Sequence, residues 1–205
     1  CLRIHGSDTE LQKYGLFALT VSISVAQEED LKPWISRIVR QLFYSLLQFT
    51  GDHHLQVLVL DALIIMQEVH PTIKSIYSSS DIDALLVLVG SNFNEICGRA
   101  SAILAFHLYN DPASSGPIIE SCGSIERLIS CMASKIDDQE IQVNIYSILY
   151  ALITSGADSS ALIVPLLDEN NGIRVLSSGM VSHSNSRKIL MISCKIFLSI
   201  VPYLN

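Results

Sequence analysis

Five segments of the chain repeat one pattern of apolar residues at intervals of about 45 residues. Each segment starts at an apolar anchor, and the residues 4, 7 and 8 positions later lie on the same side of a helix. The anchors are separated by 44, 41, 45 and 48 residues. A period of this length is typical of helical solenoids, whose units bury their apolar faces by stacking on their neighbours. The anchors are Leu11, Leu55, Ile96, Ile141 and Ile189.

A polar cluster precedes each anchored segment and marks the start of a helix. In three clusters an aspartate suited to capping a helix stands three residues before the anchor, at Asp8, Asp52 and Asp138. Upstream of every cluster except the first, the pattern predicts a second helix, over 34–48, 82–89, 124–133 and 173–181. Shorter helices are expected over 71–77, 117–121 and 159–167. Each unit would then contain three helices, one of them short.

One stretch carries two sequence features of a known repeat. Gly123-Ser124-Ile125 forms a small-Gly-x-Ile type of turn before the second helix, and Ile141-Gln142 is followed by Ile148-Leu149 in the third. This combination resembles one full repeat of the armadillo family. The turn recurs at Asn171-Gly172-Ile173, and the apolar-Gln pair recurs at Leu11-Gln12 and Leu55-Gln56.

The resemblance implies an all-α, right-handed solenoid of about four to five armadillo-like three-helix repeats over residues 1–205. A partial first repeat would cover 1–26, and further repeats would cover 27–69, 70–112, 113–157 and 158–205. The chain opens on Cys1 inside a repeat. We therefore expect it to be a piece of a longer protein.

Charge and hydropathy exclude two classes of partner. The formal net charge of −7 argues against nucleic acid, because binding to phosphates requires clustered Lys and Arg. No apolar run is long enough to predict insertion into a membrane. The five cysteines are odd in number, widely spaced and mostly placed in apolar helical patterns. They indicate reduced, buried thiols and an intracellular protein, cytoplasmic or nuclear.

No motif in the chain predicts catalysis, a cofactor or a metal. Phosphate-loop, dinucleotide-binding, hydrolase and zinc-protease patterns are all absent from the sequence. Asp52-His53-His54 is read as a capping aspartate followed by two exposed histidines, with a metal-binding or pH-sensing role as the alternative. Cys97 is read as a small residue at the edge of the core, or else as a reactive thiol beside Arg99. Trp34 is read as a core anchor.

The third helices line the concave groove of armadillo proteins. Within that family, importin-alpha-type repeats carry a Trp six residues and an Asn ten residues after the anchor. This chain has neither residue at those positions, so a receptor for nuclear-localisation signals is not expected. The residues found there instead are Phe17, Asp61, Ala102, Ser147 and Lys195, and then Val21, Ile65, Phe106, Ala151 and Ser199.

These features together favour a non-enzymatic scaffold or adaptor that binds a protein partner. The partner would be an apolar peptide or helix on the third-helix face, since exposed apolar residues gather there. The alternatives are a chaperone cofactor that clasps a chaperone lobe and an enzyme with an unrecognised site. The candidate partner-binding residues are Phe17, Val21, Asp61, Ile65, Arg99, Phe106, Tyr109, Ser147 and Lys195.

Overall fold

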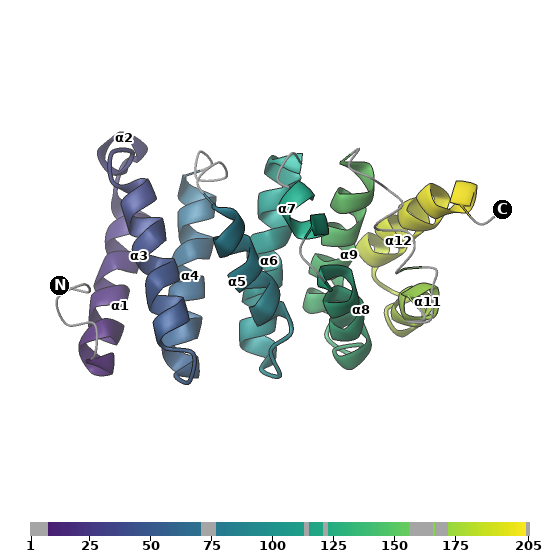
Figure 1. Ribbon diagram of the computed structural model, residues 1–205, viewed down its shortest axis with the longest axis horizontal. Helices are drawn as coiled ribbons and strands as arrows, with labels where there is room; N and C mark the ends of the chain where they lie inside the picture. The colour runs from purple at the N-terminus through teal and green to yellow at the C-terminus, as the bar shows by residue number, and fades with distance from the viewer. Residues whose placement is uncertain are drawn as a thin grey trace. The chain divides into compact units, whose positions relative to one another are not determined.

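The computed structural model describes residues 8–70, 77–112, 115–120, 123–155, 166 and 172–203. Within these residues the regular elements are all helical, and no strand occurs among them. The all-α prediction is therefore confirmed, and the helices follow one another in a repeat-like order (Figure 1). The chain divides into two compact units, Cys1–Ala84 and Leu85–Asn205.

The first unit is built around the pairing of two long helices. α1 (Thr9–Val25) packs against α4 (His53–Val69), and α3 (Ile35–Gln48) packs on α4 as well. The short α2 (Glu28–Leu31) lies between α1 and α3 in the chain. α3 is amphipathic, because its apolar residues recur every three or four positions and are buried on one side. These residues are Ile35, Val39, Leu42, Phe43 and Leu46.

The second unit repeats this arrangement with three long helices. α6 (Asn94–Asn110) packs against α9 (Gln139–Thr154), which packs against α12 (Arg187–Ile200). α7 (Ser115–Glu120) contacts α8 (Ser124–Ser134) and α9, and α11 (Gly172–Ser182) packs on α8 and α12. The turn η3 (Val201–Tyr203) follows α12. α5 (Ser79–Val89) spans the boundary between the units.

The helices predicted upstream of the polar clusters are present. α3, α5, α8 and α11 match the predicted segments within three residues at either end, and α7 corresponds to the short helix expected over 117–121. The short helices expected over 71–77 and 159–167 fall almost wholly outside the described residues. Of their described positions, Tyr77 precedes α5 and Leu166 is helical. The three-helix repeat boundaries stay a prediction.

The buried stripe predicted from the anchors is correct in the central helices. In α4, α6 and α9, the anchor and the residues 4, 7 and 8 positions after it are all buried. In α1 the stripe is rotated by about one residue: Gln12, Leu16 and Ile23 are buried, whereas Ala18 is exposed. α1 packs mainly against α4, so the face that contacts α4 sets the position of its buried stripe.

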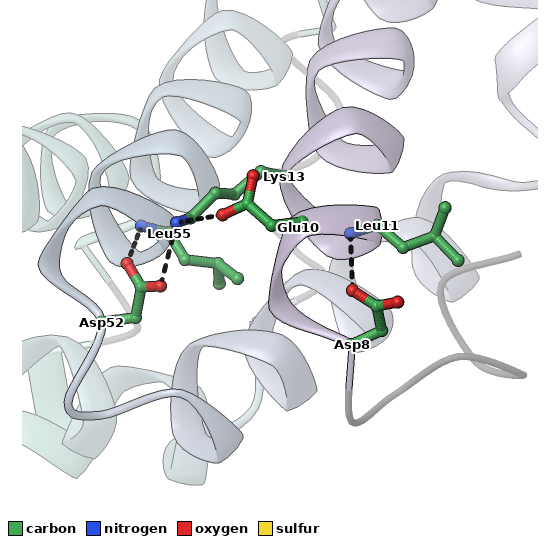
Figure 2. Close-up of polar contacts among 6 residues, drawn as sticks. All are labelled: Asp8, Glu10, Leu11, Lys13, Asp52 and Leu55. Atoms are coloured by element: carbon green, nitrogen blue, oxygen red, sulfur yellow. Dashed lines mark hydrogen bonds and ion pairs between the residues drawn. The ribbon is translucent and has the colours of Figure 1, made fainter.

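Aspartates cap three of the long helices, as the polar clusters predict. Asp8 Oδ1 accepts a hydrogen bond from the Leu11 amide at 3.1 Å, and Asp52 Oδ1 accepts one from the Leu55 amide at 2.9 Å (Figure 2). Asp138 Oδ1 does the same for the Ile141 amide at 3.2 Å. Each carboxylate satisfies an amide at the end of its helix that has no partner within the helix. α6 and α12 begin without such a side-chain cap.

Lys13 joins α1 to the start of α4. Its Nζ lies 3.0 Å from Glu10 Oε1 on its own helix and 3.2 Å from Asp52 Oδ2 (Figure 2). These two hydrogen bonds raise the pKa of Lys13. The pKa of Asp52 is lowered, first by the bond from the Leu55 amide and then by Lys13, against the opposing effect of partial burial. The cap of α4 is thus also a contact between neighbouring helices.

Candidate functional site: a groove between α6, α9 and α12

The three long helices of the second unit enclose a hollow of about 520 Å³. α6 supplies one wall, α9 the floor and α12 the opposite wall, and Pro112 lies at one edge. A hollow of this size is within the usual range for pockets that bind ligands or partner side chains. The residues that line it are Ala102, Ala105, Phe106, Leu108, Tyr109, Pro112, Asn144, Ser147, Tyr150, Ala151, Thr154, Lys188 and Ile192.

Small side chains create the hollow, and aromatic side chains border it. Ala102 and Ala105 on α6 and Ala151 on α9 leave unfilled the volume that a leucine would occupy. Phe106 and Tyr150 are half-buried in the walls, whereas Tyr109 is 84% exposed. A rim of this kind offers apolar contact area without a large cost in side-chain entropy, because an aromatic residue has few rotatable bonds.

The polar atoms of the groove are mostly occupied within the chain. Asn144 Nδ2 donates to the Gly98 carbonyl and to Ser101 Oγ, both at 3.4 Å. Ser147 Oγ donates to the Val143 carbonyl at 2.7 Å. Contacts with a partner would therefore be made chiefly through the apolar and aromatic side chains.

The charge in and beside the groove is positive. Lys188 is the charged residue in the lining, which contains no Asp or Glu. Beside it, the Lys195 ammonium lies 5.2 Å from the centre of the Tyr150 ring, in a cation–π contact that holds the ring at the rim. The groove is thus an apolar hollow with lysines along α12.

Three of the nine predicted partner-binding residues line this groove, namely Phe106, Tyr109 and Ser147. Lys195 lies at its rim through the contact with Tyr150. Arg99 is half-buried at the start of α6, and its Nη1 donates to the Glu95 carbonyl at 3.2 Å. It does not line the groove.

The other four predicted residues lie on the first unit. Phe17 and Val21 on α1 are 63% and 47% exposed, whereas Asp61 and Ile65 on α4 are half-buried. Together with Tyr14 and Val25, the two α1 residues form an exposed apolar stripe at helical spacing.

The sequence reasoning missed Tyr150 and Lys188, together with Ala105, Asn144 and Ile192. The predicted residues come from positions six and ten after the anchors, with Arg99 and Tyr109 added on α6 alone. The face that lines the groove also includes the positions three and nine residues after the anchor, such as Asn144 and Tyr150 on α9. Neighbours at i+3 and i+4 along the helix would have pointed to them.

The residues at the start of α4 lie as the sequence predicts. Asp52 caps α4 and His53 and His54 are exposed, as predicted. Within the described residues no three His, Cys, Asp or Glu side chains are placed to hold a metal ion together. None of the described helices combines the length and apolar character needed to cross a bilayer.

Two expectations about single residues are wrong. Trp34 is 53% exposed, because α3 begins one residue later and Ile35, 2% exposed, takes the core position. Cys194 is exposed on α12. Cys97 and Cys131 are buried free thiols, as expected, and Cys1 and Cys122 lie outside the described residues.

Comparison with known proteins supports the fold and shows neither a family nor a function. No protein-family model matches the chain. No curated protein matches it either. A crystal structure of an engineered protein, from the Northeast Structural Genomics Consortium, is similar with a TM-score of 0.69 at 20% sequence identity. The match covers 97% of this chain and 76% of the engineered one.

Proposed function

We propose that the chain is a non-enzymatic protein-binding module of armadillo-like repeats that holds an apolar peptide or helix on its third-helix face. The observation that carries the proposal is the hollow of about 520 Å³ between α6, α9 and α12, which is walled by alanines and bordered by the half-buried rings of Phe106 and Tyr150 and the exposed ring of Tyr109. Apolar exposure of this kind commonly marks a contact surface.

The chemistry of the groove defines the partner. The hollow admits one or two large apolar side chains as anchors, with Phe106, Tyr109 and Tyr150 supplying the contact area. Lys188 favours a partner with an acidic residue next to its anchor. Because this is one exposed charge, we expect salt to weaken binding only modestly.

A peptide-display selection against the purified chain tests the proposal. Selected peptides should carry a large aromatic or aliphatic residue, and their affinity for the Phe106→Asp variant should fall by about 30-fold or more, as expected when a central contact is lost. Circular dichroism checks that the variant stays helical. Val181→Asp on α11 is the matched control, since Val181 is 76% exposed and does not line the groove.

Tyr109→Ser provides a second variant with little risk to the fold, because Tyr109 is 84% exposed. It should weaken the same peptides about tenfold, in line with the loss of a rim aromatic residue. Selected peptides that bind both folded variants as tightly as the parent chain would rule out the groove as the binding surface.

A further inference from the structure

Two buried cysteines on different helices meet behind the groove. Cys97 on α6 and Cys131 on α8 place their sulfur atoms 3.3 Å apart. Their side chains are 0% and 4% exposed, and both are free thiols. The two residues are 34 positions apart in the chain, so the folded arrangement of the helices is what brings them together.

We propose that Cys97 and Cys131 form a reversible dithiol–disulfide site, in which oxidation covalently joins α6 to α8. A disulfide has a sulfur–sulfur length of about 2.05 Å, so the two sulfur atoms would have to move about 1 Å closer together.

A cation is fixed beside the pair. Lys135 follows Cys131 by one helical turn, and its Nζ donates to the Asn92 carbonyl and to Asn94 Oδ1, both at 2.7 Å. These bonds hold the ammonium at the start of α6, close to the first turn that carries Cys97. The pKa of Cys97 is lowered, first by the hydrogen bond from Cys131 and then by the charge of Lys135, while burial and Asp138 oppose the effect. Cys97 is therefore the nucleophile of the pair.

A second hollow brings a small oxidant to Cys131, the outer thiol of the pair. Cys97 does not line it, so peroxide has to pass Cys131 to reach the Cys97 sulfur 3.3 Å away. The hollow has a volume of about 560 Å³ and is lined by Cys131 on α8, by Lys135 just after α8 and by the turn between α5 and α6. Ser130, next to Cys131, and Ser134, about one turn further along α8, keep the wall polar. Hydrogen peroxide is small enough to enter, and a protein disulfide is not.

The oxidation balances with hydrogen peroxide as the two-electron oxidant. The Cys97 thiolate attacks one oxygen of the peroxide, so that an S–O bond forms, the O–O bond breaks and hydroxide leaves. Cys131 then attacks the Cys97 sulfenic sulfur; the S–S bond forms, the S–O bond breaks and water leaves after taking up the Cys131 proton. Two thiols and one peroxide give one disulfide and two waters. Two molecules of a thiol such as glutathione then reduce the disulfide by exchange, which restores both cysteine thiols and leaves one glutathione disulfide.

The test uses the 205-residue chain in which Cys1, Cys122 and Cys194 are replaced by Ser, so that only the pair remains. After treatment with peroxide, intact mass should fall by about 2 Da with no dimer, as expected for an internal disulfide. Arg99 and Arg127 lie between the two cysteines, so trypsin separates their peptides unless the disulfide joins them. The joined peptide should disappear on treatment with glutathione.

Two comparisons test whether the packing of α6 against α8 speeds formation of the disulfide. Neither Cys97→Ala nor Cys131→Ala, each in the same background, can form the disulfide. The remaining thiol should also react at least about tenfold more slowly with peroxide, because Cys97 alone loses the hydrogen bond that lowers its pKa and, once the bond to Cys97 is gone, burial still keeps the pKa of Cys131 raised. The pair-only chain in strong denaturant should also form the link far more slowly than the folded chain. Two results would overturn the proposal, even if a single-cysteine variant failed to fold. In one, the folded pair-only chain keeps both thiols under peroxide. In the other, it forms the disulfide no faster than the chain in denaturant.

Discussion

Gly179 on α11 leaves room for two side chains of α9. A Cβ at this position would lie 2.6 Å from Tyr146 Oη and 3.0 Å from Gln142 Oε1. The Tyr146 hydroxyl is held in place because it donates to the Leu176 carbonyl. Gly179→Ala should therefore lower the free energy of unfolding by about 1–3 kcal/mol, the usual cost of overpacking, as measured by urea denaturation.

Two further variants check the cause of that loss. Gly116→Ala should leave stability unchanged or raise it by up to about 1 kcal/mol, because no atom of the residues that the structure describes lies within 4 Å of the added Cβ and alanine favours the helix. Tyr146→Phe removes the clashing oxygen, so Gly179→Ala should cost less in that background. Equal costs in both backgrounds would contradict the proposed clash.

Asp52 contributes to stability in a way that depends on pH. Its folded-state pKa lies below the unfolded value of about 3.9, so its contribution is complete above that value and is lost as the pH falls through the folded-state pKa. At pH 7, Asp52→Asn should keep the cap and lose at most about 1 kcal/mol, because the pair with Lys13 is partly exposed. The difference between this variant and the parent should shrink below about pH 4.

The matched variant Asp52→Ala also removes the cap. It should cost about 1 kcal/mol more than Asp52→Asn at pH 7 in urea denaturation. Equal stability of the two variants would show that the hydrogen bond to the Leu55 amide contributes nothing.

Features of single residues were predictable from the sequence where their cause is local. The caps at Asp8, Asp52 and Asp138 depend on the next three residues of the chain, so the sequence predicts them. The positions of Trp34 and Gly179 depend on where another helix packs, and no local pattern contains that information. The sequence allows Cys97 to be either a small core residue or a reactive thiol, but its partner Cys131 becomes apparent only when α8 is in place.

The long helices hold the buried stripe that the sequence pattern predicts. Leu149 on α9 and Leu63 on α4 are both 0% exposed. Leu149→Ala or Leu63→Ala should each lower the free energy of unfolding by about 2–5 kcal/mol, since truncating a buried leucine leaves a cavity. Chemical denaturation followed by helical circular dichroism measures the loss.

Ser147→Ala is the control on the same helix as Leu149. Ser147 lies on the groove side, half-buried, and its hydroxyl bonds only to its own helix. It should change stability by no more than about 0.5 kcal/mol. A leucine variant that costs as little as this control would show that the stripe is misplaced.

The helices could be predicted from the sequence because their apolar residues recur periodically, whereas the groove could be predicted only in part. The apolar spacing and the polar clusters located α3, α5, α8 and α11 closely. The groove depends on the small residues Ala102, Ala105 and Ala151, which in sequence look like ordinary helix formers. Only the packing of α6, α9 and α12 turns them into a hollow.

At the scale of the whole molecule, the main helix pairings each fall within one of the two units, α1 with α4 in the first and α6 with α9 in the second. Leu149→Ala should therefore speed amide hydrogen exchange in residues 85–203 and change it much less in residues 9–70. Repeat architectures behave in this way when stability is the sum of local terms. Equal acceleration in both ranges would indicate one cooperative fold.

The far-ultraviolet circular dichroism of the chain should be that of a wholly helical protein. The expectation follows from the helical period of each anchored segment and from the helices of the described residues. Substantial strand signal would contradict both the sequence pattern and the fold.

One position of the repeat carries two different chemistries. In α9 the residue after the anchor is Gln142, whose amide donates to the Met132 and Lys135 carbonyls at the end of α8, the helix that precedes α9. In α6 the same position is Cys97, whose sulfur meets that of Cys131 on α8, a helix that follows α6 in the chain. A designer who transplants α9 would therefore need only backbone carbonyls at the end of the preceding helix, whereas a designer who transplants α6 would have to bring Cys131 on the later helix to keep the sulfur pair.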